Sequence, residues 1–404
     1  MTTTRSTNAT PLGESAANDL SARKQILFSF VIVVGFFLAF ELVARVGAYF
    51  LYNRSPYFLF YGFSSWMADA GEEGHTIARS GYFKFPPNRV LHQYGMFNEP
   101  TPIRINSLGF RGSDFSPAKA AGTTRIICLG ESSTFGFFDR DSFTYPALLQ
   151  RVFPDHRGDD SARVEVINAG IPQANSDNIR AMLKGEILGY DPDVITVYAA
   201  YNDVTPMDQN TVQRVLNWLH GHFAAYVALK HVVSALGGPE LHSRWASFVP
   251  AASAEYVHRQ IALHERRYED NLRAIYQLTT SHRAQLVFIR QPVNYSHDLA
   301  DRGKSYQEKV NEANKVLATT GKLSAEQTSF LIHAALIGVL DRLAREYAVP
   351  EVDNIAILDA HPEYFASKVH LTEDGNEALA EAIFRTVAPL ISEKVRPIAN
   401  AYPR

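Results

Sequence analysis

Cysteine is almost absent from this 404-residue chain, which contains only Cys128. One cysteine cannot form an internal disulfide, and a cysteine-rich metal site is likewise excluded. Because Cys128 lies in an apolar run, we expect it to be a buried packing residue. Asp359, His361, Glu363 and His370 do not have the spacing of ligands on one helix, so we predict neither a metal site nor a cofactor.

A strong charge of one sign is also missing. The chain carries 39 Lys and Arg against 42 Asp and Glu, a net charge of −3. This balance gives no indication of the basic surface that nucleic-acid binding requires. Internal repeats and low-complexity tracts are absent, and the 46% share of hydrophobic residues is typical of a globular protein.

One stretch near the N-terminus lacks charge altogether. Residues 26–40, ILFSFVIVVGFFLAF, are 15 uncharged residues, and the apolar character resumes after Glu41 and Arg45. The full segment 25–51 reaches the length of about 20 residues that a membrane span needs. The alternative is a cleaved signal peptide, but no small-residue cleavage site follows and the apolar run continues too far. We predict an uncleaved transmembrane anchor, with Glu41 and Arg45 paired on one helix face.

The flanking charges predict the orientation of this anchor. Arg5, Arg23 and Lys24 precede the span, whereas Arg45 and Arg54 lie within or after it. The positive-inside rule then favours a cytoplasmic N-terminus and a single-pass protein whose bulk is extracytoplasmic, in the periplasm.

The rest of the chain divides into three parts by composition. Residues 1–24 are small and polar, which predicts a disordered tail. Residues 52–122 are aromatic and proline-rich without a helical period, so we predict an extended connector that packs on the main domain. Residues 123–395 form the main domain, in which apolar β-branched runs alternate with helical patterns.

This alternation predicts an α/β fold with a parallel sheet covered by helices on both faces. Five runs are predicted as strands: residues 125–129, 164–168, 194–200, 285–290 and 356–360. Two helical insertions, near 205–283 and 303–347, are too long for simple connections. They either cap the site or enlarge the helical layer.

Polar and small residues gather where these elements end. The first strand runs into GESSTFG (130–136), the second into NAG (168–170) and the third into YND (201–203), while VHLT (369–372) precedes a helix. Ligands bind at the carboxyl ends of the strands in open α/β sheets, so these segments are expected to converge.

The converging residue types are those of acyl transfer. Histidine activates a serine hydroxyl by taking its proton near neutral pH, which makes Ser132 and His370 a candidate nucleophile and base. The Ser132 and Gly170 N–H groups and the Asn202 side-chain amide are candidate donors to the oxyanion of the tetrahedral intermediate.

The four segments, in this order, resemble the conserved blocks of the SGNH (GDSL-type) hydrolase superfamily. The resemblance covers roughly residues 103–395, and INSLGFRG (105–112) is similar to a lead-in found in membrane-anchored bacterial members. It implies a flavodoxin-like three-layer α/β/α fold and ester hydrolysis or acyl transfer. It also implies that Ser132 is the nucleophile, His370 the base, and Gly170 and Asn202 oxyanion donors.

Three positions depart from the family's pattern. Glu131 replaces the usual Asp, Tyr201 replaces a Gly, and Ser367 stands three residues before His370 where the family has Asp. That acid normally orients the histidine. A backbone carbonyl, Ser367 itself, or a displaced acid such as Glu363 or Asp359 are the candidate replacements, and low activity is the remaining alternative.

Two functions follow from these residues. The first is a membrane-anchored serine esterase or O-acyltransferase whose substrates are acyl esters, including acylated cell-envelope saccharides. The second is a catalytically weak or inactive SGNH-fold protein that binds carbohydrate or serves assembly. Ser367 favours the second, and the complete set of Ser132, Gly170, Asn202 and His370 favours the first.

Overall fold

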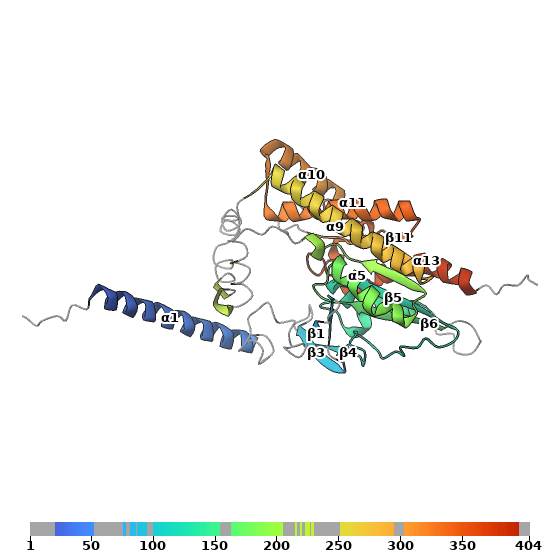
Figure 1. Cartoon of the computed structure of the whole chain (residues 1–404), viewed down its shortest axis with the longest axis horizontal. Helices are drawn as coiled ribbons and strands as arrows, with labels where there is room; N and C mark the ends of the chain where they lie inside the picture. Colours follow the sequence, from blue (N-terminus) through green and yellow to red (C-terminus); the bar gives the residue numbers. More distant parts are fainter. Residues whose placement is uncertain are drawn as a thin grey trace, which may run out of the picture.

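A five-stranded parallel sheet forms the core of the main domain (Figure 1). The computed structural model describes residues 21–51, 76–77, 81–85, 87–94, 100–153, 163–204, 251–294, 303–395 and a few positions between 215 and 229. The strand order is β11-β9-β7-β5-β6, and all neighbours pair in parallel. The strands are β5 (Thr123–Gly130), β6 (Arg163–Gly170), β7 (Val194–Tyr198), β9 (Gln285–Ile289) and β11 (Glu351–Val352). Four predicted strands are thereby confirmed.

The fifth predicted strand, residues 356–360, is wrong. These residues belong to helix α12 (Asn354–Ala360), and the fifth strand is the shorter β11 just before it. The Asp353 side chain accepts a hydrogen bond from the Ala356 N–H at 3.0 Å and so caps the helix. Ile355 and Leu358 are both buried, a spacing of three that suits a helix face and not a strand.

Helices cover both faces of the sheet, as predicted. Alternate β5 residues face opposite layers: Ile127 and Leu129 join one core cluster, whereas Ile126 and Cys128 join the other. The first layer contains α5 (Ser176–Gly185), α9 (Ala254–Ser281), α10 (Tyr306–Thr320) and α11 (Ala325–Tyr347). The second contains α4 (Tyr145–Val152), α12 and α13 (Glu373–Val395).

The second predicted helical insertion consists of α10 and α11, which pack with α9 on the first layer (Figure 1). A short antiparallel pair, β8 (Ala252–Ser253) with β10 (Lys322–Leu323), joins the start of α9 to the turn between α10 and α11. In the first predicted insertion, residues 251–283 contain β8 and α9, and most of residues 205–250 lie outside the described residues.

The N-terminal helix α1 (Ala22–Leu51) projects away from the sheet (Figure 1). Its stretch Arg23–Gly47 is long and apolar enough to cross a membrane, although a signal sequence passes the same test of length and composition. The predicted pair forms, with Arg45 Nε 2.6 Å from Glu41 Oε1. Residues 1–20 of the predicted tail lie outside the described residues.

The described part of the predicted connector packs against the residues that follow β5. Strand β2 (Phe83–Lys84) pairs with β1 (Thr76–Ile77), and β3 (Arg89–Tyr94) forms an antiparallel hairpin with β4 (Pro100–Ile105). Apolar side chains of this region contact residues that follow β5; the cluster comprises Phe85, Leu91, Ile103, Ile105, Phe135 and Phe137. The connector therefore supports the candidate nucleophile's turn.

Candidate active site

The nucleophile turn follows β5 without a loop. The strand ends at Gly130, and the short helix α3 (Ser132–Phe135) begins two residues later. A Cβ on Gly130 would lie only 2.0 Å from Thr134 Oγ1, so a side chain there would block the turn. Gly136 ends α3 with φ of 86°, a left-handed conformation that glycine adopts without strain. This turn leaves Ser132 at the carboxyl edge of the sheet.

Ser132 and His370, which are 238 positions apart, meet in a direct hydrogen bond. His370 Nε2 lies 2.9 Å from Ser132 Oγ. The histidine stands on a tight turn in which the N–H groups of Ala366 and Ser367 donate to the His370 carbonyl at 2.8 and 3.2 Å. Ser133 Oγ donates to the Val369 carbonyl at 3.1 Å and so ties α3 to this turn.

Ser367 occupies the place of the missing acid. Its Oγ lies 2.7 Å from His370 Nδ1 and also accepts the His370 backbone N–H at 3.2 Å. A hydroxyl that accepts from Nδ1–H favours the tautomer whose unprotonated Nε2 faces Ser132. The two displaced acids are engaged elsewhere: Glu363 contacts His361 Nδ1, and Asp359 accepts the Tyr306 N–H.

Two aromatic rings enclose the histidine. The rings of Phe137 and Phe138 both lie 5.2 Å from the His370 ring, centroid to centroid. Phe138 has φ of 76°, a strained conformation for a bulky residue and one that occurs at functional sites. Burial lowers the pKa of His370 to about 4, because the charged imidazolium loses its hydration. Both ring nitrogens contact neutral hydroxyls.

Glu131 fixes the exit of β7 beside the nucleophile. Its fully buried carboxylate accepts the backbone N–H groups of Ala200 and Asn202 at 3.2 and 3.1 Å, and Gln291 Nε2 donates to it at 3.4 Å. Burial raises the pKa of Glu131 well above its ordinary value. The longer arm of Glu, compared with Asp, is thus used to bind the backbone that carries Asn202.

Asp203 stabilises the local structure through hydrogen bonds to Ser176. It is buried and accepts the Ser176 N–H at 2.9 Å and the Ser176 hydroxyl at 2.6 Å. Burial raises the pKa of Asp203 to about 6. These bonds join the start of α5 to the end of β7, where Asn202 stands.

Two of the three predicted oxyanion donors, Gly170 and Asn202, have hydrogen-bond partners within the chain. The Gly170 N–H donates to Asn168 Oδ1 at 3.0 Å, and a Cβ on Gly170 would lie 2.2 Å from Phe135 N. Gly170 is therefore packed closely against α3, and its role as an oxyanion donor stays a prediction. Asn202 Nδ2 donates to the Ala174 carbonyl at 2.9 Å, so its side chain lies beside the loop that follows β6.

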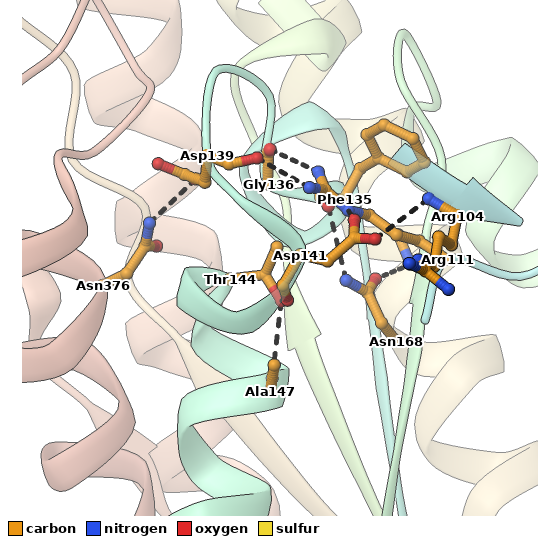
Figure 2. Close-up of polar contacts among 11 residues, drawn as sticks. Arg104, Arg111, Phe135, Gly136, Asp139, Asp141, Thr144, Ala147, Asn168 and Asn376 are labelled. Carbon is orange, nitrogen blue, oxygen red and sulfur yellow. Dashed lines mark hydrogen bonds and ion pairs between the residues drawn. The ribbon is translucent and has the colours of Figure 1, made fainter. Parts of the chain in front are cut away.

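Arg111, to which the sequence predictions assigned no role, binds the loop that follows α3 (Figure 2). Its Nη1 donates to the carbonyls of Phe135 and Gly136 at 3.0 and 2.5 Å, and its Nη2 donates to the Asp139 carbonyl at 2.7 Å. Its Nε pairs with Asp141 Oδ1 at 2.9 Å. Arg111 belongs to the segment INSLGFRG, which is similar to a lead-in of membrane-anchored family members. That resemblance implied no function for the arginine.

The same loop is bound from the histidine side. The Asp139 carboxylate accepts from Asn376 Nδ2 of α13 at 2.9 Å (Figure 2). Burial raises the pKa of Asp139 to about 7. At the surface, Arg140 pairs with Glu373 in the first turn of α13. The segment 135–140 thus connects the nucleophile's helix with the helix that follows His370.

We expect Arg111→Lys to lower kcat about 10- to 100-fold, through displacement of Phe137 and Phe138 from His370, with little change in KM. A lysine keeps the charge but cannot bind four acceptors with a rigid planar group. Arg104→Lys is the matched control, because Arg104 contacts Asp141 through its backbone N–H. Steady-state kinetics and thermal unfolding of both variants test this; equal kcat values in folded proteins would contradict it.

Comparison with known proteins gives a family and several distant structures. The solved structures include a lipase/acylhydrolase from Enterococcus faecalis, with 16% identity, 69% of this chain and 100% of that chain covered, and a TM-score of 0.37. A GDSL-like lipase from Bacteroides thetaiotaomicron has 10% identity, coverages of 66% and 88%, and a TM-score of 0.36. The acetyl xylan esterase AlAXEase has 16% identity, coverages of 65% and 99%, and a TM-score of 0.38. No curated protein matches the chain.

The sequence pattern of one family matches residues 126–383, which is more than half of the chain and includes both Ser132 and His370. The chain therefore belongs to the GDSL-like lipase/acylhydrolase family of enzymes that act on ester bonds.

Proposed function

We propose that this chain is a membrane-anchored serine esterase in which Ser132 is the nucleophile, His370 the general base and Ser367 the group that orients the base. The observation that carries the proposal is the continuous hydrogen-bonded series from Ser132 Oγ through the His370 ring to Ser367 Oγ, with separations of 2.9 and 2.7 Å. This series supplies what an activated serine needs.

The reaction proceeds in two halves. Ser132 Oγ bonds to the ester carbonyl carbon while His370 Nε2 takes its proton, and the carbonyl oxygen becomes an oxyanion. The Ser132 N–H and the Asn202 amide are the donors that we assign to this oxyanion. The intermediate collapses, the leaving alcohol takes the proton from His370, and the acyl group stays on Ser132. Water then repeats the sequence and releases the acid.

If an alcohol replaced water in the second half-reaction, the same residues would catalyse O-acyl transfer. The helix α1 and the charges that flank it support a position of the catalytic domain outside the cytoplasm, where acylated cell-envelope saccharides are the proposed substrates. The distinction between hydrolase and transferase depends on whether the second half-reaction excludes water.

Product analysis tests this function. Full-length protein in detergent is incubated with p-nitrophenyl acetate, with and without a saccharide acceptor, and the released acetate and any acetylated saccharide are measured. Acetate alone supports the esterase, and acetylated saccharide supports the transferase. If folded protein consumes no ester and forms no acyl-enzyme, the proposal is wrong and the binding-protein alternative stands.

The low pKa of His370 predicts activity in unusually acidic solution. Only the neutral imidazole accepts a proton, so kcat/KM is lost as the pH falls through the pKa of about 4 and not through the ordinary value. Ser367→Asp places a carboxylate on Nδ1, which raises the histidine pKa by about one to three units and moves this acid limb upward. A pH–rate profile of wild type and Ser367→Asp measures the shift; identical acid limbs would refute the assigned role of Ser367.

A further inference from the structure

A cavity of about 1280 Å³ lies along the outer edge of β6, the strand at one end of the sheet. In the described part of the chain, the β3–β4 hairpin reaches this edge through two isolated bridges, from Ile105 to Arg111 and from Arg111 to Asn168. Residues 163–168 line the cavity over about 17 Å of strand, between α4 and the hairpin. Figure 2 shows part of its wall, including Arg104 and Arg111. The cavity is thus an extended space outside the candidate active site.

The backbone of this strand edge already has hydrogen-bond partners. Gln150 of α4 donates from Nε2 to the Val164 carbonyl at 3.1 Å, and its Oε1 accepts the Val166 N–H at 2.7 Å. A free strand edge invites another strand to pair with it, and charged side chains are one way to prevent this. Because the Gln150 side chain occupies the edge, the charges around the cavity need another explanation. The same side chain blocks the addition of a peptide strand.

Arginines from three elements converge on the cavity. Arg104 of β4, Arg151 of α4 and Arg163 of β6 line it, and all three are exposed. In the described part of the chain, no acid forms an ion pair with any of these side chains. Like charges that are gathered without counter-charges repel one another, which disfavours the folded state. This arrangement is therefore expected where an anion binds.

Three acids also line the cavity, and two of them are neutralised within the chain. Asp141 pairs with Arg111 at 2.9 Å. Glu165 accepts from Nε of the buried Arg125 at 2.7 Å. The third acid, Asp114, is exposed and sets one negative charge against the three unpaired arginines. The cavity consequently keeps an excess of positive charge.

The shape and the neutral groups of the cavity indicate the kind of anion. Cations on three separate elements suit a ligand with several anionic groups better than a single ion. The guanidinium group matches the geometry of carboxylate and phosphate. Asn88, Ser113 and Ser142 are exposed in the lining and can form hydrogen bonds with sugar hydroxyls. The lining aromatics, Phe115 and Phe153, are half-buried and buried, so they do not offer the open faces on which nucleic-acid bases stack.

We propose that this cavity binds an anionic glycan, whose repeated carboxylate or phosphate groups contact Arg104, Arg151 and Arg163. The site holds the protein on an acidic polymer and is distinct from the place where an ester reacts. Arg111 and Asp141 connect the two, because they line the cavity and Arg111 binds the loop 135–140 beside the histidine. The inference does not depend on the catalytic chemistry.

Titration calorimetry of the full-length protein in detergent tests the site. The probes are oligogalacturonate, oligo(glycerol phosphate) and the neutral galacto-oligosaccharide of the same length. We expect the neutral sugar to bind at least about tenfold more weakly than a charged probe. Binding of only one charged probe identifies carboxylate or phosphate as the group recognised. If neither charged probe binds, or if the neutral sugar binds equally well, the inference is wrong.

Charge-removing variants locate the binding. Arg151→Gln/Arg163→Gln should weaken it at least about tenfold. Arg266→Gln/Arg345→Gln is the matched control, because it removes two exposed cations from α9 and α11 that likewise form no ion pair in the described part of the chain. The control should stay within about twofold of wild type. Equal weakening in both folded double variants would show attraction to net charge alone and would overturn the site.

Alkylation of single cysteines tests the location without removing an arginine. A saturating charged glycan should slow maleimide labelling of Ser142→Cys, in the cavity lining, at least about fivefold and leave Ser281→Cys, an exposed position at the end of α9, unchanged. Cys128 is buried and stays unreactive. Equal labelling rates at Ser142→Cys with and without bound glycan would place the ligand elsewhere. Ser132→Ala should bind the glycan as wild type does, so lost hydrolysis with intact binding concerns the proposed function alone.

Discussion

Replacing Ser132 with alanine is expected to lower kcat for ester hydrolysis by roughly 10⁵- to 10⁶-fold, the scale on which serine hydrolases lose activity with their nucleophile. The alanine has no atom that can form the acyl-enzyme, and what remains is catalysis by the oxyanion donors and binding alone. Burst kinetics with p-nitrophenyl acetate measure this directly, because the burst reports the acyl-enzyme.

Ser133→Ala is the matched control for that experiment. Ser133 is the adjacent hydroxyl, and its Oγ donates to the Val369 carbonyl and not to His370. Its loss removes one hydrogen bond that ties α3 to the histidine turn, so we expect less than about a tenfold fall in kcat. If Ser133→Ala abolishes the burst and Ser132→Ala retains it, the nucleophile has been assigned to the wrong serine.

His370→Ala is expected to lower kcat by roughly 10⁴- to 10⁶-fold, because no other base then accepts the Ser132 proton. Rate measurement across pH adds a second readout: the residual activity should no longer show the acid limb near pH 4 that wild type owes to this imidazole. Retention of that limb in the variant would mean that another group titrates.

His361→Ala is the matched control for the base. His361 lies nine positions earlier, is exposed and contacts Glu363 through Nδ1. Substitutions at exposed positions of this kind change free energies by less than about 0.5 kcal/mol, so we expect kcat within about twofold of wild type. A large loss in His361→Ala would indicate that the whole turn, and not one imidazole, supports catalysis.

The parts of the site that the sequence predicted are those that follow from topology. Parallel strands bring their carboxyl ends to one edge, so a serine after β5 and an asparagine after β7 were expected near each other. The histidine, which lies before a helix and not after a strand, was proposed as the base from its residue type and position, and the family resemblance implied the same role. The structure places Ser132 and His370 in hydrogen-bond contact, as expected.

The parts that the sequence did not predict depend on contacts between distant segments. Nothing in the sequence near Gly170 reveals that Phe135 packs against it too closely for a side chain. Residues 356–360 have the apolar pattern of a strand, but Ile355 and Leu358 pack on two core clusters from a helix that the Asp353 cap begins. Long-range contacts override local preference at such positions.

Ser367 and Arg111 illustrate two further limits. The sequence left several groups that could orient His370, and only the 2.7 Å separation between Ser367 Oγ and Nδ1 distinguishes among them. Arg111 was part of a recognised motif, but its role depends on carbonyls of a loop that turns back toward it. Glu41 was likewise expected to pair with Arg45, and its contact with Ala224 could not be inferred from spacing.

We propose that Ser132 is an activated nucleophile whose base, His370, is oriented by the Ser367 hydroxyl and not by an acid. Fluorophosphonate labelling of the folded, full-length protein, followed by mass mapping of the labelled peptide, tests it most directly. We expect one label, on Ser132, that disappears in His370→Ala. A folded protein that takes no label, or one labelled on Ser133, would contradict it.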